Sequence, residues 1–120
     1  MIDHLGLTVA DLAKSRTFYA KALQPLGYAV MMEFPGALGF GAKGKPDFWL
    51  GQGPASGKVH VAFASPDRKT VDAFYAAAIG AGGKDNGKPG LRPQYHSNYY
   101  GAFVFDPDGN NIEAVSHQPE

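Results

Sequence analysis

The chain has 120 residues, a length that fits one compact domain and is too short for two that fold independently. Apolar residues make up 44% and charged residues 18%, which excludes a disordered chain and a coiled coil. Eleven Lys and Arg residues balance eleven Asp and Glu residues, so we expect no surface for nucleic acid. The absence of cysteine excludes disulfides, thiolate nucleophiles and iron–sulfur sites.

The sequence also carries no membrane or export signal. No apolar run approaches the roughly 20 residues that span a bilayer. The first residues, Met1-Ile2-Asp3-His4, lack the basic and apolar regions of a signal peptide. We therefore expect a cytoplasmic protein with no membrane partner.

The chain repeats itself at a constant spacing of 56 residues. The segment His4–Asp11 is similar to the segment His60–Asp67, and the pair Phe18-Tyr19 recurs as Phe74-Tyr75. Agreement at one spacing over several residue types favours an internal duplication.

The duplication predicts how the domain is organised. We expect one domain over residues 1–120, with a first module at 1–57 and a second module at 58–120. Each module opens with a strand, Leu5–Val9 and Val59–Ala64, in which bulky apolar side chains alternate with small or polar ones.

A helix is expected after each opening strand. The first runs from Asp11, a good N-cap residue, to about Leu23, ahead of Pro25. The second begins at Ser65-Pro66, with serine as the cap and proline in the first turn, and ends at the glycines from Gly80 onward.

Short strands follow each helix. They are Tyr28–Phe34, Leu38–Ala42 and Asp47–Gly51 in the first module, and Gly101–Phe105 and Asn111–Ser116, joined by the turn Asp106–Gly109, in the second. Residues 84–98 are polar and contain prolines, so they are expected to form at most one weak strand and a long loop. The pattern is an α+β fold of two βαβββ modules; a ferredoxin-like order would allow fewer strands between the helices.

Three residues with metal-binding side chains are predicted to share one face of the sheet. His4 and His60 alternate with the bulky residues of their strands, and Glu113 alternates with Ile112. If Ile112 packs beneath the helices, two imidazoles and a carboxylate share the open face. This is a facial triad, which holds iron(II) or a similar divalent ion and leaves positions for substrate. Alternatively, the histidines are only hydrogen-bonded and the glutamate is solvated.

Other residues could line the same site. Alignment of the last strands of the two modules places Trp49 at the position of Glu113, so these positions supply at most three protein ligands. Trp49 either packs in the core or forms the floor of a substrate pocket. Glu33 and His117 are secondary candidates, the first as a free strand carboxylate and the second in the tail.

The segment before the last two strands concentrates tyrosine, histidine and arginine. Arg92 can clamp a carboxylate or phosphate of a substrate, and Tyr99 can bind it as well. Tyr95, His96 and Tyr100 can transfer or donate protons in catalysis. The alternative is a tyrosine-rich loop that covers a sheet edge or forms a dimer contact.

The sequence resembles the vicinal oxygen chelate superfamily, which groups glyoxalase I, bleomycin- and fosfomycin-resistance proteins and extradiol dioxygenases. The resemblance covers the whole chain and rests on the segments Ile2–Val9, Val59–Phe63 and Phe105–Glu113. It implies paired βαβββ modules that form an open, cupped mixed sheet, with the helices on the outer face, around a metal and a small substrate.

The resemblance also implies a function. The metal positions of the family match His4, His60 and Glu113, whereas Trp49 replaces a further ligand of glyoxalase I, which argues against lactoylglutathione chemistry. The implied activity is that of a lyase, isomerase or dioxygenase in which a divalent ion (Fe, Mn, Zn or Ni) acts as Lewis acid on a small oxygen-chelating substrate. The alternatives are a metal-free protein that sequesters a small molecule, as in bleomycin resistance, and a domain whose site has decayed. A homodimer is expected from the family.

Overall fold

The computed structural model describes residues 1–120 and contains two α-helices, one short 3-10 helix and eight strands. The first half of the chain forms β1 (Leu5–Val9), α1 (Leu12–Ala22), η1 (Gln24–Leu26), β2 (Ala29–Phe34), β3 (Ala37–Gly41) and β4 (Phe48–Gln52). The second half forms β5 (His60–Ala64), α2 (Arg68–Gly80), β6 (Lys84–Leu91), β7 (Tyr100–Phe105) and β8 (Asn111–Ser116). The order β-α-β-β-β occurs twice, so the predicted tandem modules are confirmed.

Each module forms its own four-stranded mixed sheet. The strand orders are β1-β4-β3-β2 and β5-β8-β7-β6, and in both sheets the opening strand pairs in parallel with the last one. The remaining pairs are antiparallel. β1 and β5 are therefore edge strands, and each has one edge that pairs with no other strand of the chain. The predicted α+β fold is confirmed, with two separate sheets in one chain.

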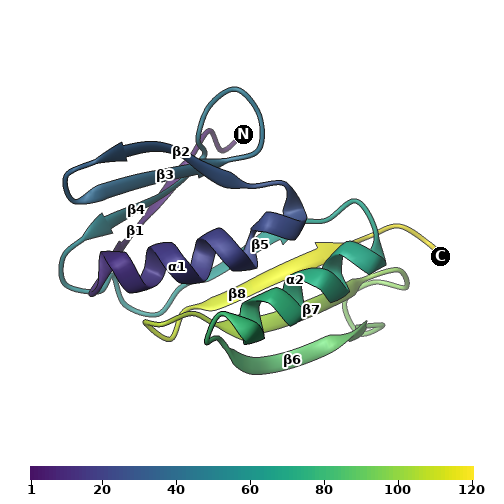
Figure 1. Cartoon of the computed structure of the whole chain (residues 1–120). Coiled ribbons are helices and arrows are strands. Elements are labelled where there is room, and N and C mark those ends of the chain that lie inside the picture. Colours follow the sequence, from purple (N-terminus) through teal and green to yellow (C-terminus); the bar gives the residue numbers. More distant parts are fainter.

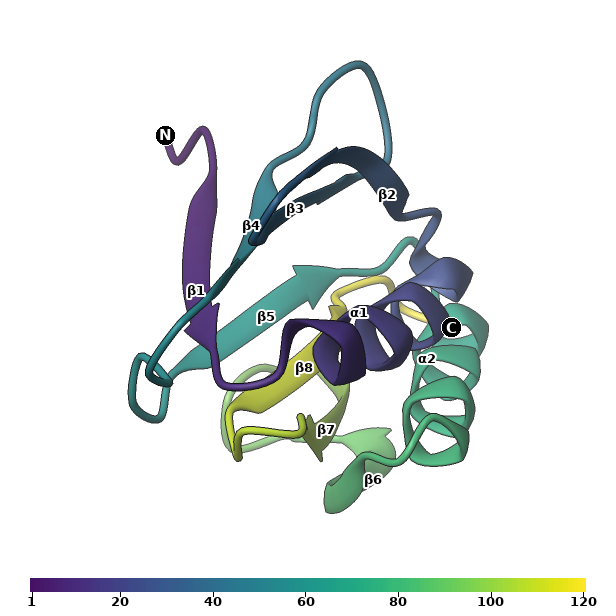
Figure 2. The same ribbon diagram turned by 60° about the vertical axis from the view of Figure 1, so that its left-hand side comes forward.

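The helix-covered faces of the two sheets share one hydrophobic core. α1 and α2 pack against each other, and α2 also packs against β6, β7 and β8. Figures 1 and 2 show α1 running between the two sheets. The rings of Phe48 and Phe63 meet edge to face at 5.3 Å and join the two modules directly. Neither helix is long and apolar enough to cross a membrane.

The helix caps confirm one prediction and correct another. Asp11 caps α1, and its carboxylate accepts a hydrogen bond from the Lys14 amide at 3.1 Å. The cap of α2 is Asp67, whose carboxylate accepts from the Thr70 amide at 2.7 Å. The prediction of a cap at Ser65 was wrong, because its hydroxyl donates instead to the backbone carbonyl of Asp67 at 2.8 Å.

The segment after α2 contains more strand than its composition predicted. β6 extends over eight residues and pairs with β7, with irregularities in register at Gly87. β6 is an edge strand and has no partner strand on its outer side. It can therefore contain Pro89, whose backbone has no N–H to donate to a neighbouring strand. The connecting loop is therefore limited to residues 92–99.

A buried carboxylate ties the first helix to the second module. Asp106, in the turn between β7 and β8, accepts hydrogen bonds from the backbone amides of Asp108 (2.9 Å) and Asn110 (2.8 Å). The hydroxyl of Tyr19, a fully buried residue of α1, donates to the other carboxylate oxygen. This contact fixes the turn that precedes β8 against the shared core.

Candidate functional site

The second sheet holds a buried glutamate on the face opposite α2. Glu113, in β8, has a side chain that is 1% exposed. Its Oε1 lies 2.7 Å from His60 Nε2, and its Oε2 accepts a hydrogen bond from the Tyr99 hydroxyl. Gly101 permits this approach, since a Cβ there would lie 3.3 Å from Oε2. Donors on both oxygens compensate for the removal of the carboxylate from water.

The loop 92–99 forms an aromatic cluster beside this carboxylate. The ring of Tyr99 packs edge to face with Tyr95 at 5.0 Å and with His117 at 5.2 Å, and His96 packs on His117 at 5.6 Å. Burial is the main cause, and the hydrogen bond to Glu113 the second, that raises the pKa of Tyr99 well above its usual value. Tyr99 is therefore a neutral hydroxyl donor at physiological pH.

Tyr100 lies on the other face of the second sheet. Its hydroxyl donates to Asp72 Oδ1, in α2, at 2.7 Å, and the guanidinium of Arg68 lies over its ring. Adjacent residues of a strand point to opposite faces, so Tyr100 faces the helix and Gly101 faces Glu113. Tyr100 therefore does not face Glu113, and the prediction that it transfers a proton there has no support from the geometry.

Arg92, the first residue of the loop, is hydrogen-bonded mainly to the end of β6. Its guanidinium donates to the carbonyl oxygens of Gly90 and Lys88, both at 2.8 Å, and lies 5.3 Å from the ring centre of Phe103. These bonds fasten β6 to the start of the loop. If Arg92 binds an anionic substrate as predicted, it must do so with guanidinium N–H groups that these two bonds leave free.

The first sheet presents an aromatic surface at the equivalent place. Trp49 stacks on Phe34, with ring centres 6.3 Å apart and an angle of 18°, and a Cβ at Gly39 would lie 2.9 Å from the Trp49 ring. His4 lies next to this surface, 60% exposed, with Nδ1 2.8 Å from Asp3 Oδ1. His4 and Trp49 line the same open hollow of about 570 Å³. Here the sheet offers one imidazole and no buried acid.

The three predicted metal ligands do not meet within one chain. His60 and Glu113 are in direct contact, but His4 precedes β1 of the first sheet and contacts neither of them. No group of three or more His, Asp or Glu side chains is arranged to hold a metal ion. An imidazole and a buried carboxylate suit two positions of a divalent ion, but a single chain does not supply the third.

The fold and the sequence agree on the family. A family model described as the Glyoxalase/Bleomycin resistance protein/Dioxygenase superfamily matches residues 37–114. The chain belongs to this superfamily. No curated protein matches the chain. The sequence resemblance to glyoxalases and related proteins is thereby confirmed.

Solved structures of the superfamily have the same fold. A glyoxalase/bleomycin resistance protein from Albidiferax ferrireducens is 28% identical, with 98% of each chain covered and a TM-score of 0.83. A lactoylglutathione lyase from Agrobacterium tumefaciens is 20% identical over 97% of this chain and 92% of its own, with a TM-score of 0.70, and shows the fold alone. A glyoxalase I variant from Zea mays is 25% identical over 95% of this chain and 46% of its own, with a TM-score of 0.70.

Sequence reasoning missed two residues that shape the surroundings of Glu113. Gly101 leaves the space for the carboxylate, and the ring of Phe103 lies 6.2 Å from that of His60. Phe103 is the direct neighbour of Glu113 across β7 and β8. The alternation that placed the glutamate would have identified both, because Gly101 and Phe103 share its face.

Proposed function

We propose that the protein is a divalent-metal-dependent enzyme whose ligands are His60 and Glu113 of one copy and His4 of a second copy. The observation that carries the proposal is the buried Glu113, 2.7 Å from His60 on a sheet face without a helix. Together they offer two of the three ligands of a facial triad. A bound ion of the Fe, Mn, Zn or Ni type would supply Lewis-acid polarisation of neighbouring substrate oxygens.

The two edge strands support the role of a second copy. β1 and β5 each have an edge without a partner strand, and such edges can pair with another chain. Pairing of β1 of one copy with β5 of another would join the two sheet faces that carry His4 and His60. A two-fold symmetric homodimer would contain two such joined surfaces. We therefore propose the homodimer as the functional form.

The surrounding side chains suit a small substrate with an apolar part. Trp49 stacked on Phe34 offers a flat surface next to His4. The neutral hydroxyl of Tyr99 donates a hydrogen bond to Glu113. Tyr95 and His96, in the same loop 92–99, are the proposed proton-transfer groups. Lyase, isomerase and dioxygenase chemistry are all compatible with this set.

A specific observation favours a second candidate function. Both oxygens of Glu113 already have partners, His60 and Tyr99, so the carboxylate is satisfied without an ion. In that case Trp49 and Phe34 would bind a small aromatic molecule in a metal-free sequestering protein.

Metal analysis separates the two functions. We expect protein purified without chelator to hold a stoichiometric amount of metal, His60→Ala to lose it, and the control His96→Ala, which changes an exposed loop histidine, to keep it. Equal, near-zero metal in the wild type and in His60→Ala would contradict the enzyme proposal. Ligand binding that is unchanged by EDTA would then support the sequestering protein.

A further inference from the structure

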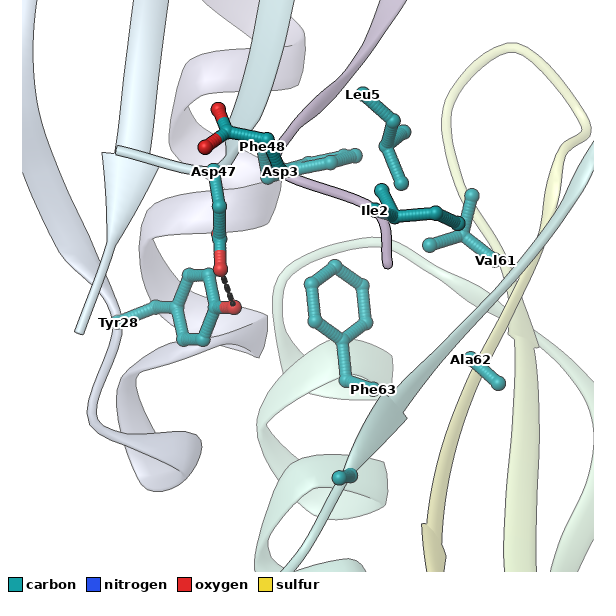
Figure 3. A pocket seen from close by; sticks show the side chains of 10 residues that line it. Ile2, Asp3, Leu5, Tyr28, Asp47, Phe48, Val61, Ala62 and Phe63 are labelled. Carbon is teal, nitrogen blue, oxygen red and sulfur yellow. Dashed lines mark hydrogen bonds between the residues drawn. The ribbon is translucent and has the colours of Figure 1, made fainter. Parts of the chain in front are cut away.

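The apolar cavity between the two modules lies at the strand edges through which two copies are proposed to pair. It has a volume of about 220 Å³, and Figure 3 shows Leu5 of β1 and Val61 and Phe63 of β5 in its lining. Pairing of β1 of one copy with β5 of another would bring the second copy against this cavity. A ligand site that stays open in the homodimer must therefore lie elsewhere on the chain.

An open hollow of about 280 Å³ lies beside the proposed metal ligands on the second sheet. It is lined by Asn86, Gly87, Arg92, Tyr95, Phe103 and Asn111, none of which belongs to β1 or β5, and is called the Arg92 hollow below. Asn111 shares the face of Glu113 because it lies two residues before it in β8, and Phe103 pairs with Glu113 across β7 and β8. Since the ring of Phe103 lies 6.2 Å from that of His60, the Arg92 hollow adjoins the proposed metal site.

The guanidinium of Arg92 is built into one wall of this hollow. A Cβ at Gly87 or at Gly90 would lie 3.2 Å from a guanidinium nitrogen, so both glycines leave room for the group. The guanidinium donates to the carbonyl oxygens of Lys88 and Gly90, both at 2.8 Å, and lies 5.3 Å from the ring centre of Phe103. These contacts fix its position before a ligand arrives, which lowers the entropic cost of binding.

The positive charge of Arg92 has no carboxylate partner. None of the ion pairs of the chain includes Arg92, and no Asp or Glu lines the hollow. Of the five N–H donors of the guanidinium, those on Nη1 go to Gly90 and, at 3.4 Å, to Leu91, and one on Nη2 goes to Lys88. The N–H on Nε and the other one on Nη2 remain free for an anion.

The other polar groups of the hollow are donors as well. Asn111 Oδ1 accepts a hydrogen bond from Asn86 Nδ2 at 3.2 Å, which leaves the amide N–H groups of Asn111 free. Tyr95 is exposed and adds a hydroxyl to the lining. A planar carboxylate, with its two oxygens, matches the free N–H groups of a guanidinium. Phe103 offers an apolar surface next to them.

We propose that the Arg92 hollow binds the carboxylate of a small organic acid, with the carboxylate on Arg92 and Asn111 and the apolar body on Phe103. As a statement about the substrate, this inference rests on the proposed function: because Phe103 also lies beside His60, the neighbouring oxygens at the other end of such an acid would face the metal ligands. The substrate class is then a carboxylic acid whose apolar body separates the carboxylate from the chelating oxygens. The carboxylate site itself requires no metal.

Calorimetric titration of the full chain tests the proposal on metal-free protein. Metal is removed with EDTA, and the chelator, itself a carboxylate, is then exchanged for Tris chloride buffer. The probes are phenylacetate and its neutral counterpart phenylacetamide. We expect phenylacetate to bind at least about tenfold more tightly. Arg92→Gln should abolish this preference. Asn111→Asp, which adds a negative charge to the lining and keeps Arg92, should weaken phenylacetate binding by about tenfold or more.

Arg68→Gln is the matched control, because Arg68 also lies 5.3 Å from the centre of an aromatic ring, that of Tyr100, but outside the hollow on the helix-covered face. It should bind phenylacetate like the wild type. A wild type without a preference for phenylacetate overturns the proposal, whether or not the variants fold. Unchanged affinity in a folded Arg92→Gln or Asn111→Asp, or an equal loss in Arg68→Gln, also overturns it.

The titration separates this proposal from the metal site. A wild type that holds metal when purified without chelator but shows no preference for phenylacetate would overturn the carboxylate site alone. A preference that depends on Arg92, in a protein that holds no metal, would support the carboxylate site and overturn only the metal-dependent function.

Discussion

Trp49 and Glu113 occupy equivalent positions in the two sheets. Trp49 pairs with Gly6 between β4 and β1, and Glu113 pairs with Ala62 between β8 and β5. Gly6 and Ala62 are themselves related by the 56-residue repeat, so the register confirms the alignment of the duplicated strands. The same scaffold therefore carries an aromatic surface in one module and a buried acid in the other.

This equivalence predicts the effect of adding an acid to the first module. If two copies join their sheet faces as proposed, Trp49→Glu places a fourth ligand beside His4. We expect its metal dissociation constant to be about tenfold or more lower than that of Trp49→Ala, measured by competition with a chromophoric chelator. The alanine variant is the control, since both changes remove the stacking on Phe34. Equal affinities would count against the joined site.

A site shared between two copies also predicts complementation. His4→Ala and Glu113→Gln should each hold little metal when purified alone. In a mixed dimer, however, one site combines the intact His4 of one copy with His60 and Glu113 of the other. Equimolar refolding of the two variants should therefore recover about a quarter of the wild-type metal content, because half of the dimers are mixed and each has one intact site. No recovery would indicate that the site does not combine two copies.

Tyr19→Phe is expected to destabilise the protein. It removes the donor to the buried Asp106, which then keeps a carboxylate oxygen with one fewer partner. We expect the free energy of unfolding in urea to fall by about 1–3 kcal/mol. Tyr75→Phe, which removes a similar hydroxyl from Asp85 near the surface, is the control and should have a clearly smaller effect. Similar losses in both variants would refute the structural role assigned to Asp106.

The cap of α2 predicts a contribution to stability that depends on pH. Hydrogen bonds from Thr70 lower the pKa of Asp67 below its usual value of 3.8. Because the folded-state pKa is the lower one, this stabilisation is fully present above pH 3.8 and is lost as the pH falls through the folded-state value. Asp67→Asn should therefore show a flatter dependence of unfolding free energy on pH in the acid range.

The uncharged cap Asp67→Ser serves as the control for this experiment and should flatten the profile in the same way. The measurement is urea unfolding followed by circular dichroism at a series of acid pH values. An acid profile identical to that of the wild type in both variants would show that Asp67 does not titrate with folding.

Local patterns predicted most of the fold correctly, and the errors have local causes. Asn111–Ser116 was predicted to the residue, because polar and apolar side chains alternate from Asn111 to Ala114 and a clear turn, Asp106–Gly109, precedes the strand. The cap of α2 was misplaced because both Ser65 and Asp67 can cap a helix, and only the backbone course decides which one reaches the Thr70 amide. β6 was underestimated because its polar composition says nothing about pairing with β7.

The sequence by itself determined which residues alternate along β5 and β8, since successive residues of a strand point in opposite directions. With Ile112 packed beneath the helices, this alternation places His60 and Glu113 on one face. Only the tertiary structure decided where the face carrying His4 lies. The two modules bury their helix-covered sides in one shared core, through contacts such as Phe48 with Phe63, and in this arrangement His4 does not join His60 and Glu113. The hydrophobic effect has no preferred direction. The apolar pattern of a strand therefore shows which of its faces is buried, but not how the two modules pack together.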